Sequence, residues 1–326
     1  MMPSELDHWR PSASLRAIQV RAACLAATRQ FFSERKVLEV ETPLLVGAPV
    51  TDVNLHSVAV ELDGQTRFLH TSPEYAMKRL LAAGSGDIYQ ICKVARGAEA
   101  SRLHNPEFTL LEWYRCGMSM RQLIDEIAAL LAVLAGALGL ARPAATFITY
   151  REVFRRSLRL DPLLAKREEL LVAVEPLAVN AATLRRLSQD ELLDLLMGAL
   201  IGPTLAHDAP VFVTHYPASQ AALAQLDPQD RRVALRFELY WRGMELANGF
   251  QELTLAGEQR TRFNADNVER QRRGLAARAI DARFLAALEC GLPSCAGVAL
   301  GFDRLLMALG GYTRIEEVLA FTTEHA

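Results

Sequence analysis

The sequence is poor in cysteine, in net charge and in long hydrophobic runs, and each shortage excludes a class of protein. Its five cysteines are odd in number and contain no CxxC pair. This argues against a disulfide framework and a zinc site, and it favours reduced thiols in a cytoplasmic protein. The formal net charge is −2, so the composition lacks the basic excess that is typical of nucleic-acid-binding proteins.

Hydrophobic segments long enough to cross a membrane are also missing. The longest apolar run, residues 127–141, falls short of the roughly 20 residues that a bilayer crossing requires. We therefore expect a buried helix there and no membrane attachment. The first ten residues are polar and acidic, so we expect no signal peptide.

Glycine-rich phosphate loops are absent as well, since neither GxxxxGK[ST] nor GxGxxG occurs. If a nucleotide binds, we expect it to lie on a sheet rather than in a glycine loop. What is present is the composition of a globular protein: 51% of the residues are hydrophobic and 23% are charged. Such a chain can bury a sizeable core, and its length fits one large domain or two small ones.

The hydrophobic periodicity predicts strands that pair with their sequence neighbours, with helices set beside them. This indicates an α+β fold with a mostly antiparallel sheet. A helical insertion is expected at about residues 142–228, and tight turns near Gly243 and Gly249. The expected helices are 14–35, 73–82, 119–139, 256–280 and 302–310, and the expected strands are 37–45, 87–95, 108–117, 210–217, two or three within 233–255, and 295–301.

A glutamate stands inside one of these apolar strands. In "FTLLEWYRCG", Phe108, Glu112 and Tyr114 fall on one face because alternate residues of a strand share a face. A buried carboxylate is costly unless it has a partner. The alternative is that this side of the strand faces water.

A second strand repeats the pattern. In "NGFQE", Asn248, Phe250 and Glu252 share one face. Two strands that each present an aromatic ring and a carboxylate could form a pocket for an ammonium ligand, through ion pairing and cation–π attraction.

A further acidic pair, Glu238 and Glu245, flanks the turn near Gly243. Two carboxylates that approach each other across a turn suit Mg²⁺, which also binds substrate phosphates. Two solvated surface glutamates are the alternative interpretation.

Two arginines are candidates for phosphate binding. Arg96 ends a strand, and Arg304 begins a helix just after Gly301. Arginine binds phosphate oxygens in bidentate fashion, and a helix N-terminus favours anions. Each arginine could instead form an ordinary surface ion pair.

Five segments in order resemble the class II aminoacyl-tRNA synthetases, over nearly the whole chain. "VLEVETPLL", "VARGAEASRLHNPEFTLLEWY" and "GVALGFDRLLMAL" resemble motifs 1, 2 and 3 of that family, and "TSPEYAMKRLL" and "GMELANGFQEL" resemble its lysyl branch. The chain resembles lysyl paralogues that modify elongation factor P more than the lysyl-tRNA synthetases themselves, because motif 1 begins near the N-terminus and we expect no anticodon-binding barrel. The resemblance implies one catalytic domain over residues 1–326.

The resemblance implies an ATP-dependent ligase that activates (R)-β-lysine or lysine as an adenylate. It then transfers the aminoacyl group to a lysine ε-amine of elongation factor P. It also implies Mg²⁺, a homodimer built on motif 1, a cytoplasmic location and no use of tRNA. The alternatives are a lysyl-tRNA synthetase core that charges tRNA, and a catalytically silent regulatory subunit. The presence of Arg96, Glu245 and Arg304 argues against the silent subunit.

The same resemblance assigns roles residue by residue. Arg96 is expected to hold the α-phosphate, Arg304 the γ-phosphate, and Phe108 the adenine ring, with Gly301 allowing the nucleotide to approach. Glu238 and Glu245 are expected to bind Mg²⁺. The other expected ATP-binding residues are Gly97, Ala98, Glu99, His104, Asn105 and Leu246. The expected amino-acid-binding residues are Ser72, Pro73, Glu74, Glu112, Tyr114, Ala247, Asn248, Phe250 and Glu252.

The chain departs from the family pattern at a few positions. Ala95 and Ala98 stand where motif 2 commonly has phenylalanine and an acidic residue, and we expect Glu99 to substitute for the acidic residue. Ala247 stands where lysyl-tRNA synthetases typically carry glycine. We expect its methyl group to trim the amino-acid pocket and so to influence which lysine isomer binds.

Overall fold

The structure, a computed structural model, describes residues 9–326 and divides into two compact units. Unit 1 takes in the described part of Met1–Met118 together with Ala129–Arg142 and Thr254–Ala326. Unit 2 comprises Ser119–Ala128 and Pro143–Leu253. Most of the N-terminal segment on which the signal-peptide expectation rests lies outside the described residues.

Four strands of unit 1 lie side by side in the order β1-β5-β6-β11. The central strand β6 pairs antiparallel with both β5 and β11, while β1 pairs parallel with β5. This confirms the predicted pair of strands that flank the loop of residues 96–106. The bounds are β1 Leu38–Glu39, β5 Ile88–Ala95, β6 Glu107–Cys116 and β11 Cys295–Gly301.

A small three-stranded sheet of unit 1 has the order β2-β4-β3. Its strands are β2 Leu45–Val46, β3 Ala59–Leu62 and β4 Gln65–Leu69. Within residues 37–45 we expected a strand that Pro43 would end or place at a sheet edge. The segment instead holds the end of the short strand β1, which stops at Glu39, and the first residue of β2, which starts at Leu45. Pro43 lies between them, and proline cannot donate the hydrogen bond that a continued ladder would need.

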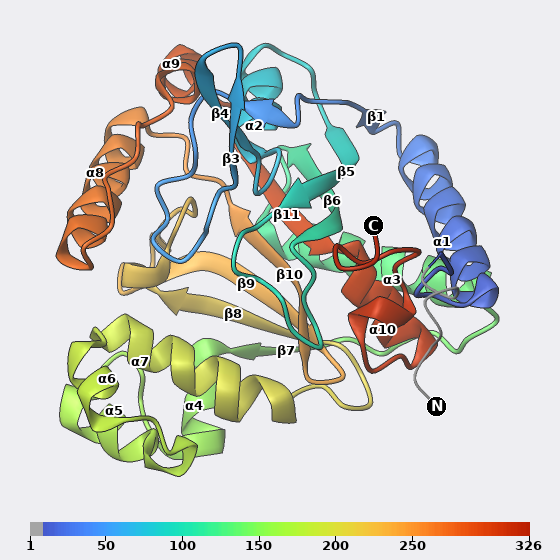
Figure 1. Ribbon diagram of the computed structural model, residues 1–326. Helices are drawn as coiled ribbons and strands as arrows, with labels where there is room; N and C mark the ends of the chain where they lie inside the picture. Colours follow the sequence, from blue (N-terminus) through green and yellow to red (C-terminus); the bar gives the residue numbers. More distant parts are fainter. Residues whose placement is uncertain (1–8) are drawn as a thin grey trace. The chain divides into compact units, whose positions relative to one another are not determined.

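The helices of unit 1 begin and end at residues that the sequence marks. Ser14 caps the first helix by accepting a hydrogen bond from the Ala17 amide at 3.1 Å. Figure 1 shows this helix beside α10, and the backbone of Ser12 bonds to that of Ala320. The bounds are α1 Leu15–Glu34, α2 Glu74–Ala82, α8 Ala256–Arg272, α9 Ala282–Gly291, α10 Phe302–Gly310 and the 3₁₀ turn Ile315–Glu317.

The strands of unit 2 lie in the order β10-β9-β8-β7. Strands β9 and β10 form a hairpin whose two-residue turn, Arg242 and Gly243, has φ values of 52° and 71°. A Cβ on Gly243 would lie 2.7 Å from the Pro203 carbonyl oxygen, so this position requires glycine. The turn predicted near Gly249 is wrong, since that residue lies within β10. The bounds are β7 Thr146–Thr149, β8 Val211–Pro217, β9 Val233–Trp241 and β10 Met244–Gln251.

The helices of unit 2 gather beside β7 and β8 (Figure 1). Capping boxes at Thr149 and Ser188 begin α4 and α7. Their apolar faces bury Phe154 and Leu196 against Val213 and Tyr240. The bounds are α4 Tyr150–Leu158, α5 Arg167–Ala173, α6 Ala181–Arg186 and α7 Gln189–Leu196. A π-helical turn, Met197–Ile201, and the 3₁₀ turns Glu175–Leu177, Gly202–Thr204 and Ala218–Gln220 complete the set.

The expected helix over the longest apolar run is α3, Met120–Ala137, and it buries Leu123, Ile127 and Leu134 completely. Among residues 9–326, no helix combines the length and hydrophobicity that a membrane crossing demands. None of the five cysteines forms a disulfide, and Cys290 is exposed.

Candidate active site

Unit 1 brings Arg96, Arg304 and His104 together. Partial burial and, to a smaller extent, the positive charges of Arg304 and Arg96 together lower the pKa of His104 to about 4. The Ser101 hydroxyl and His104 Nδ1 share a hydrogen bond of 2.8 Å. His104 is therefore neutral at physiological pH, and its surroundings are positive, which suits an anionic ligand.

The loop between β5 and β6 is held by the C-terminal part of unit 1. Arg304 Nε donates to the Leu103 carbonyl at 3.2 Å, and Arg102 Nη1 donates to the Thr313 carbonyl at 2.6 Å. Asn105 Oδ1 accepts from the Thr323 amide and hydroxyl at 3.3 and 3.2 Å. These contacts fix His104 and Asn105 before any ligand binds. Sequence reasoning missed Thr323, for which no local signal exists.

A second set of contacts supports Arg304 through its neighbour in sequence. Asp303 is 1% exposed, pairs with Arg21 of α1, and accepts from the Thr109 amide at 2.7 Å. Arg21 Nη2 also donates to the Val318 carbonyl at 2.9 Å. The start of α10, where Arg304 lies and which Gly301 precedes, is thereby joined to α1 and β6.

Phe108 lies beneath Arg96, whose guanidinium carbon is 5.0 Å from the ring centroid. An adenine ring stacked on Phe108 would therefore lie beside a positive charge. The neighbouring Gly97 amide donates to the His56 carbonyl at 2.7 Å. Ala98 adopts a left-handed φ of 61°, which is uncommon for alanine, and Glu99 follows it in the same loop.

Glu112 is at the centre of a polar cluster in unit 1. It is 1% exposed, so the alternative of a solvated strand face is excluded. The hydroxyls of Ser72 and Tyr114 donate to its two carboxylate oxygens, each at 2.7 Å. The pKa of Glu112 is raised to about 7, because burial and the charge of Glu74, which raise it, outweigh the two hydroxyls and Lys78, which lower it.

Glu74, the second expected carboxylate of unit 1, already has a cationic partner. Its Oε1 lies 2.5 Å from Lys78 Nζ, one turn further along α2. Lys78 is 1% exposed and approaches the rings of Tyr114 and Phe284, each at 5.9 Å. Sequence reasoning missed this lysine, although its i,i+4 spacing from Glu74 is a recognised signal for a helical ion pair. Pro73, expected between Ser72 and Glu74, precedes α2 as its N-cap, and the Ser72 hydroxyl accepts from the Glu74 amide at 3.0 Å.

In unit 2, Asn248 and Phe250 share a face of β10, since they lie opposite Glu238 and Arg236 of β9. Asn248 Oδ1 is buried and accepts no hydrogen bond from the described residues. Phe250 packs against Ala221, Ala224 and Ala234 rather than standing free. Glu252, just beyond β10, is 1% exposed. The predicted amide, ring and carboxylate are therefore all largely buried.

Glu238 is the centre of a second polar cluster, in unit 2. Its Oε2 accepts from the hydroxyls of Tyr216 and Tyr240, each at 2.6 Å, and its Oε1 accepts from Arg236 Nη2 at 2.6 Å. Arg236 also donates to the Gln220 carbonyl at 2.7 Å and lies 4.6 Å from the Tyr216 ring centroid. Sequence reasoning missed these three partners of Glu238.

The predicted metal pair fits Mg²⁺ only in part. Glu245 is exposed and lies opposite Tyr240. It shares a face with Glu238, because Tyr240 and Glu238 are two residues apart on β9. Glu238 would have to give up Arg236 or a tyrosine to bind a metal ion. No group of three or more His, Cys, Asp or Glu side chains in the described part of the chain is arranged to hold one. Mg²⁺ commonly uses one or two carboxylates plus phosphate oxygens and water, and Glu245 fits that use.

The expectation for Ala247 needs a correction. A bulge separates Glu245 from Ala247, which lies opposite Leu239, while Asn248 lies opposite Glu238. Successive strand residues point to opposite faces, so the Ala247 methyl group does not line the face that carries Asn248. Ala247 and Leu246 are both 2% exposed and belong to the core.

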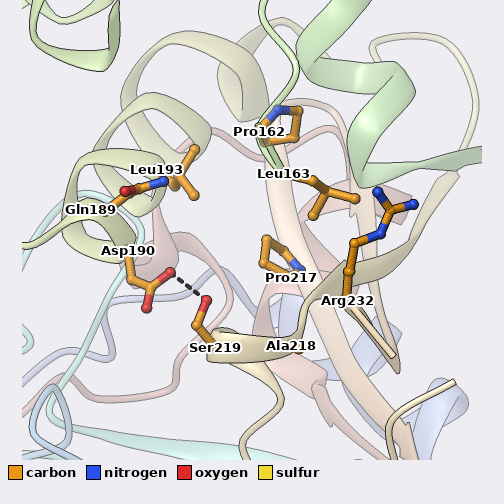
Figure 2. Close-up of a pocket in the computed structure, with 9 residues that line it drawn as sticks. All are labelled: Pro162, Leu163, Gln189, Asp190, Leu193, Pro217, Ala218, Ser219 and Arg232. Carbon is orange, nitrogen blue, oxygen red and sulfur yellow. Dashed lines mark hydrogen bonds between the residues drawn. The ribbon is translucent and has the colours of Figure 1, made fainter. Parts of the chain in front are cut away.

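A surface pocket of about 380 Å³ in unit 2 contains none of the predicted site residues (Figure 2). Ser219 donates to Asp190 at 2.7 Å across its floor, and Arg232 at its rim pairs with Asp230. The pocket is lined by Pro162, Leu163, Gln189, Asp190, Leu193, Pro217, Ala218, Ser219 and Arg232. The predicted chemistry therefore does not depend on this pocket.

Comparisons with known proteins agree along the whole chain. The family described as "tRNA synthetases class II (D, K and N)" matches residues 4–325. Proteins named elongation factor P–(R)-β-lysine ligase are similar throughout. The chain is 46% identical to the one from Pectobacterium atrosepticum over 99% of this chain and 100% of the relative, and 48% identical to the one from Mannheimia succiniciproducens over 99% of each. The relative from Haemophilus influenzae is 47% identical over 98% of this chain and 99% of its own length.

Proposed function

This chain belongs to the class II tRNA synthetases (D, K and N), and on that premise we propose that it is an ATP-dependent ligase that joins (R)-β-lysine to elongation factor P. The observation that carries the proposal is the identity of 46–48% over 98–99% of the chain with relatives of that name. Membership of the family implies the use of ATP. The positive surroundings of His104 in unit 1 support an anionic substrate there.

In the first step, a carboxylate oxygen of the amino acid attacks the α-phosphorus of ATP. The bond from that phosphorus to pyrophosphate breaks, and an aminoacyl-adenylate forms. Arg96 holds the α-phosphate, Arg304 holds the γ-phosphate, and Phe108 stacks on adenine. Neutral His104 and Asn105 offer hydrogen bonds without adding charge. The protein positions the reactants and neutralises developing charge, and this is the main source of rate enhancement in such reactions.

The amino groups of the substrate are recognised by carboxylates. In unit 1, Glu112 forms an ion pair with an ammonium group of the substrate. The hydroxyls of Ser72 and Tyr114 donate hydrogen bonds to its two carboxylate oxygens and so fix their positions. Glu74, at the start of α2, is the second carboxylate proposed to contact an amino group of the substrate. Asn248 and Glu252 are the amino-acid-binding residues proposed for unit 2. The buried Asn248 Oδ1 supports a polar ligand there, because no described residue donates a hydrogen bond to it.

In the second step, the ε-amine of a lysine on elongation factor P attacks the carbonyl carbon of the adenylate. The amine must be neutral, a C–N bond forms, and AMP leaves with the electron pair of the C–O bond. No nucleophilic side chain of the enzyme is needed. This acceptor places the enzyme in the cytoplasm.

Mg²⁺ bound by Glu245 and by phosphate oxygens would neutralise charge on the triphosphate. We assign the metal to Glu245, because Glu238 already accepts three hydrogen bonds.

A homodimer built on motif 1 is part of the proposal. Leu38, Leu44 and Leu45 of that segment are 54%, 44% and 37% exposed, and such apolar side chains are typical of an interface. Analytical ultracentrifugation should give the mass of two chains for the wild type, and Leu45→Glu should shift it to one. A monomeric wild type would contradict the dimer and leave the ligase intact.

The test of the function combines exchange and transfer. Wild-type enzyme should exchange labelled pyrophosphate into ATP when (R)-β-lysine is added, and should add one β-lysyl group to elongation factor P in an intact-mass measurement. Arg304→Ala, a matched negative control, should lose both by more than about 100-fold, in line with the loss of a transition-state charge partner. Label transfer to tRNA and not to elongation factor P would replace the proposal with a tRNA-charging synthetase core. No exchange with lysine or β-lysine would favour a silent subunit.

A further inference from the structure

Glu74 and Glu112, the two carboxylates that unit 1 offers to an amino group, differ in their counter-charge. Glu74 has the Lys78 ammonium at 2.5 Å. Glu112 has only hydroxyls at hydrogen-bond distance, from Ser72 and Tyr114. A fully buried carboxylate remains costly to ionise when its only hydrogen-bond partners are hydroxyl groups, because these do not offset the loss of hydration in full.

No element packed against Glu112 brings a cation into ion-pair contact with it in the described structure. On β5, Gln90 lies directly opposite and the Cys92 thiol lies nearby; on β11, Ala299 lies directly opposite. Helix α2 supplies Glu74, which repels a charge on Glu112, and Lys78, which attracts it. The site is therefore short of one positive charge whenever Glu112 is ionised.

The acid–base behaviour of Glu112 follows from this arrangement. Burial, with the charge of Glu74, raises its pKa to about 7, so near neutrality a large share of the molecules carry it as a carboxylic acid. In that form Glu112 itself donates a hydrogen bond, and one of the two hydroxyls must turn from donor to acceptor. Ser72 and Tyr114 can both do so, because a hydroxyl group both donates and accepts.

We propose that Glu112 is a proton-linked counter-ion: it is protonated in the empty site and gives up its proton when the substrate's ammonium group arrives. The inference rests on the proposed function in one respect, namely that the substrate is an amino acid with a second amine. The O–H bond of Glu112 breaks, the proton passes to solvent, and an N–H of the ammonium donates to the freed carboxylate oxygen. The site then contains the same net charge before and after binding.

Lys78 acts as a positioning residue in this scheme. Its charge holds Glu74 at the start of α2 and favours the ionised form of Glu112. Removing that charge without changing the shape of the side chain much, as in Lys78→Met, moves the ionisation of Glu112 to higher pH. A purely structural role would lower stability or activity without moving this pH.

The test is a proton count during binding of (R)-β-lysine and of lysine by titration calorimetry, repeated in two buffers of different ionisation enthalpy. The wild type is expected to release close to one proton per site at about pH 6 and almost none at about pH 8.5. Glu112→Gln measures any protons that come from the substrate. Glu107→Gln is the matched control, because this glutamate lies on the same strand and is 57% exposed; it should release protons as the wild type does.

Kinetics give an independent readout. At saturating ATP, kcat/KM for the amino acid in pyrophosphate exchange should fall about tenfold per pH unit below about pH 6 in the wild type, as a single-proton requirement demands. The same profile should be flat in Glu112→Gln. Because phosphate groups also titrate near pH 6, only the difference between the two profiles is used. In Lys78→Met the midpoint should lie at higher pH than in the wild type.

The outcomes separate this inference from the proposed function. Exchange without proton release, with equal profiles in the wild type and Glu112→Gln, overturns the inference and leaves the ligase intact. No exchange with either amino acid overturns the proposed function. If Glu112→Gln no longer binds the amino acid, Lys78→Met decides: an unchanged midpoint contradicts the linkage, and a raised midpoint supports it.

Discussion

Glu112 of unit 1 and Glu238 of unit 2 are two buried glutamates on strands, and they differ in a single feature. Each accepts hydrogen bonds from two hydroxyl groups, Ser72 and Tyr114 for the first and Tyr216 and Tyr240 for the second. Glu238 also accepts from an arginine of its own strand, Arg236. The negative charge of Glu238 is neutralised by a cation of the protein itself. A carboxylate whose partners are only hydroxyl groups is instead stabilised most by a cation that the ligand brings.

The pairing also affects the pKa of Arg236. Burial alone would lower the pKa of Arg236, but Glu238 and Tyr216 raise it above its ordinary value. We therefore assign Glu238 to the stability of unit 2 and Glu112 to the binding of substrate. Substitutions of the two glutamates should therefore change different properties of the protein.

Glu238→Gln should have the largest effect, and it should be on stability. It leaves the buried Arg236 without its charge partner, and breaking a buried ion pair on one side typically costs about 3–5 kcal/mol. The free energy of unfolding in urea at pH 7 measures this loss. Adding Arg236→Met to Glu238→Gln should recover part of it. A single variant as stable as the wild type would show that the pair contributes nothing.

Glu112→Gln should act on catalysis instead. Removing the charged partner of a buried ammonium typically costs 2–5 kcal/mol, so kcat/KM for the amino acid should fall by about 10²–10³-fold at pH 8. KM for ATP should change little. Pyrophosphate exchange measures both constants. A rise in KM for ATP of similar size would indicate a general disturbance of the site.

The dependence of stability on pH should also reveal the protonation of Glu112. The folded state holds the Glu112 proton up to about pH 7, while the ordinary value is 4.5. Between these values the folded state binds more protons than the unfolded state, so stability falls as pH rises, by at most about 1.4 kcal/mol per pH unit. Unfolding at pH 5 and pH 8 should show this slope in the wild type and lose it in Glu112→Gln. The same slope in the wild type and in Glu112→Gln would show that Glu112 is ionised throughout.

Glu245→Gln sharpens the contrast within unit 2. If Glu245 is the protein's ligand for Mg²⁺, its loss should raise the metal concentration for half-maximal exchange by roughly tenfold, comparable to the loss of a supporting interaction at a metal site. The free energy of unfolding should stay near that of the wild type. An unchanged metal requirement would remove Glu245 from the metal site.

Ala247→Gly should have the smallest effect. Its methyl group lies on the face opposite Asn248, so the preference between α- and β-lysine should not change. Glycine within a strand should lower stability by about 0.5–1 kcal/mol. A shifted isomer preference in the exchange assay would show that the far face of β10 does shape the amino-acid pocket.

The sequence predicted most of the fold because its signals were local. Apolar segments predicted β5, β6 and β11, Ser14 marked the start of the first helix, and Gly243 marked a turn that the structure contains. The errors arose where tertiary pairing decides. Residues 37–45 alternate like one strand, yet they divide between two sheets. Gly249 looked like a turn, but the register with β9 makes it a strand residue.

The candidate site was predictable in its residues and not in their partners. The position of Glu112 on the strand indicated a buried carboxylate, and the structure confirms the burial. Lys78 and Arg236 were open to prediction from spacings of four and two residues. The bulge that turns Ala247 away was not, because a strand sequence does not reveal where an extra residue interrupts the alternation. Thr323 contacts Asn105 across 218 residues, which no local pattern indicates.

The most direct test of the contrast is a crystal structure with a non-hydrolysable analogue of the β-lysyl-adenylate. The account predicts a substrate ammonium within about 3 Å of a Glu112 oxygen, the distance of a charge-assisted hydrogen bond. It also predicts that Glu238 keeps its bonds to Arg236, Tyr216 and Tyr240. An ammonium group held by Glu238, with Glu112 left to its two hydroxyls, would contradict it.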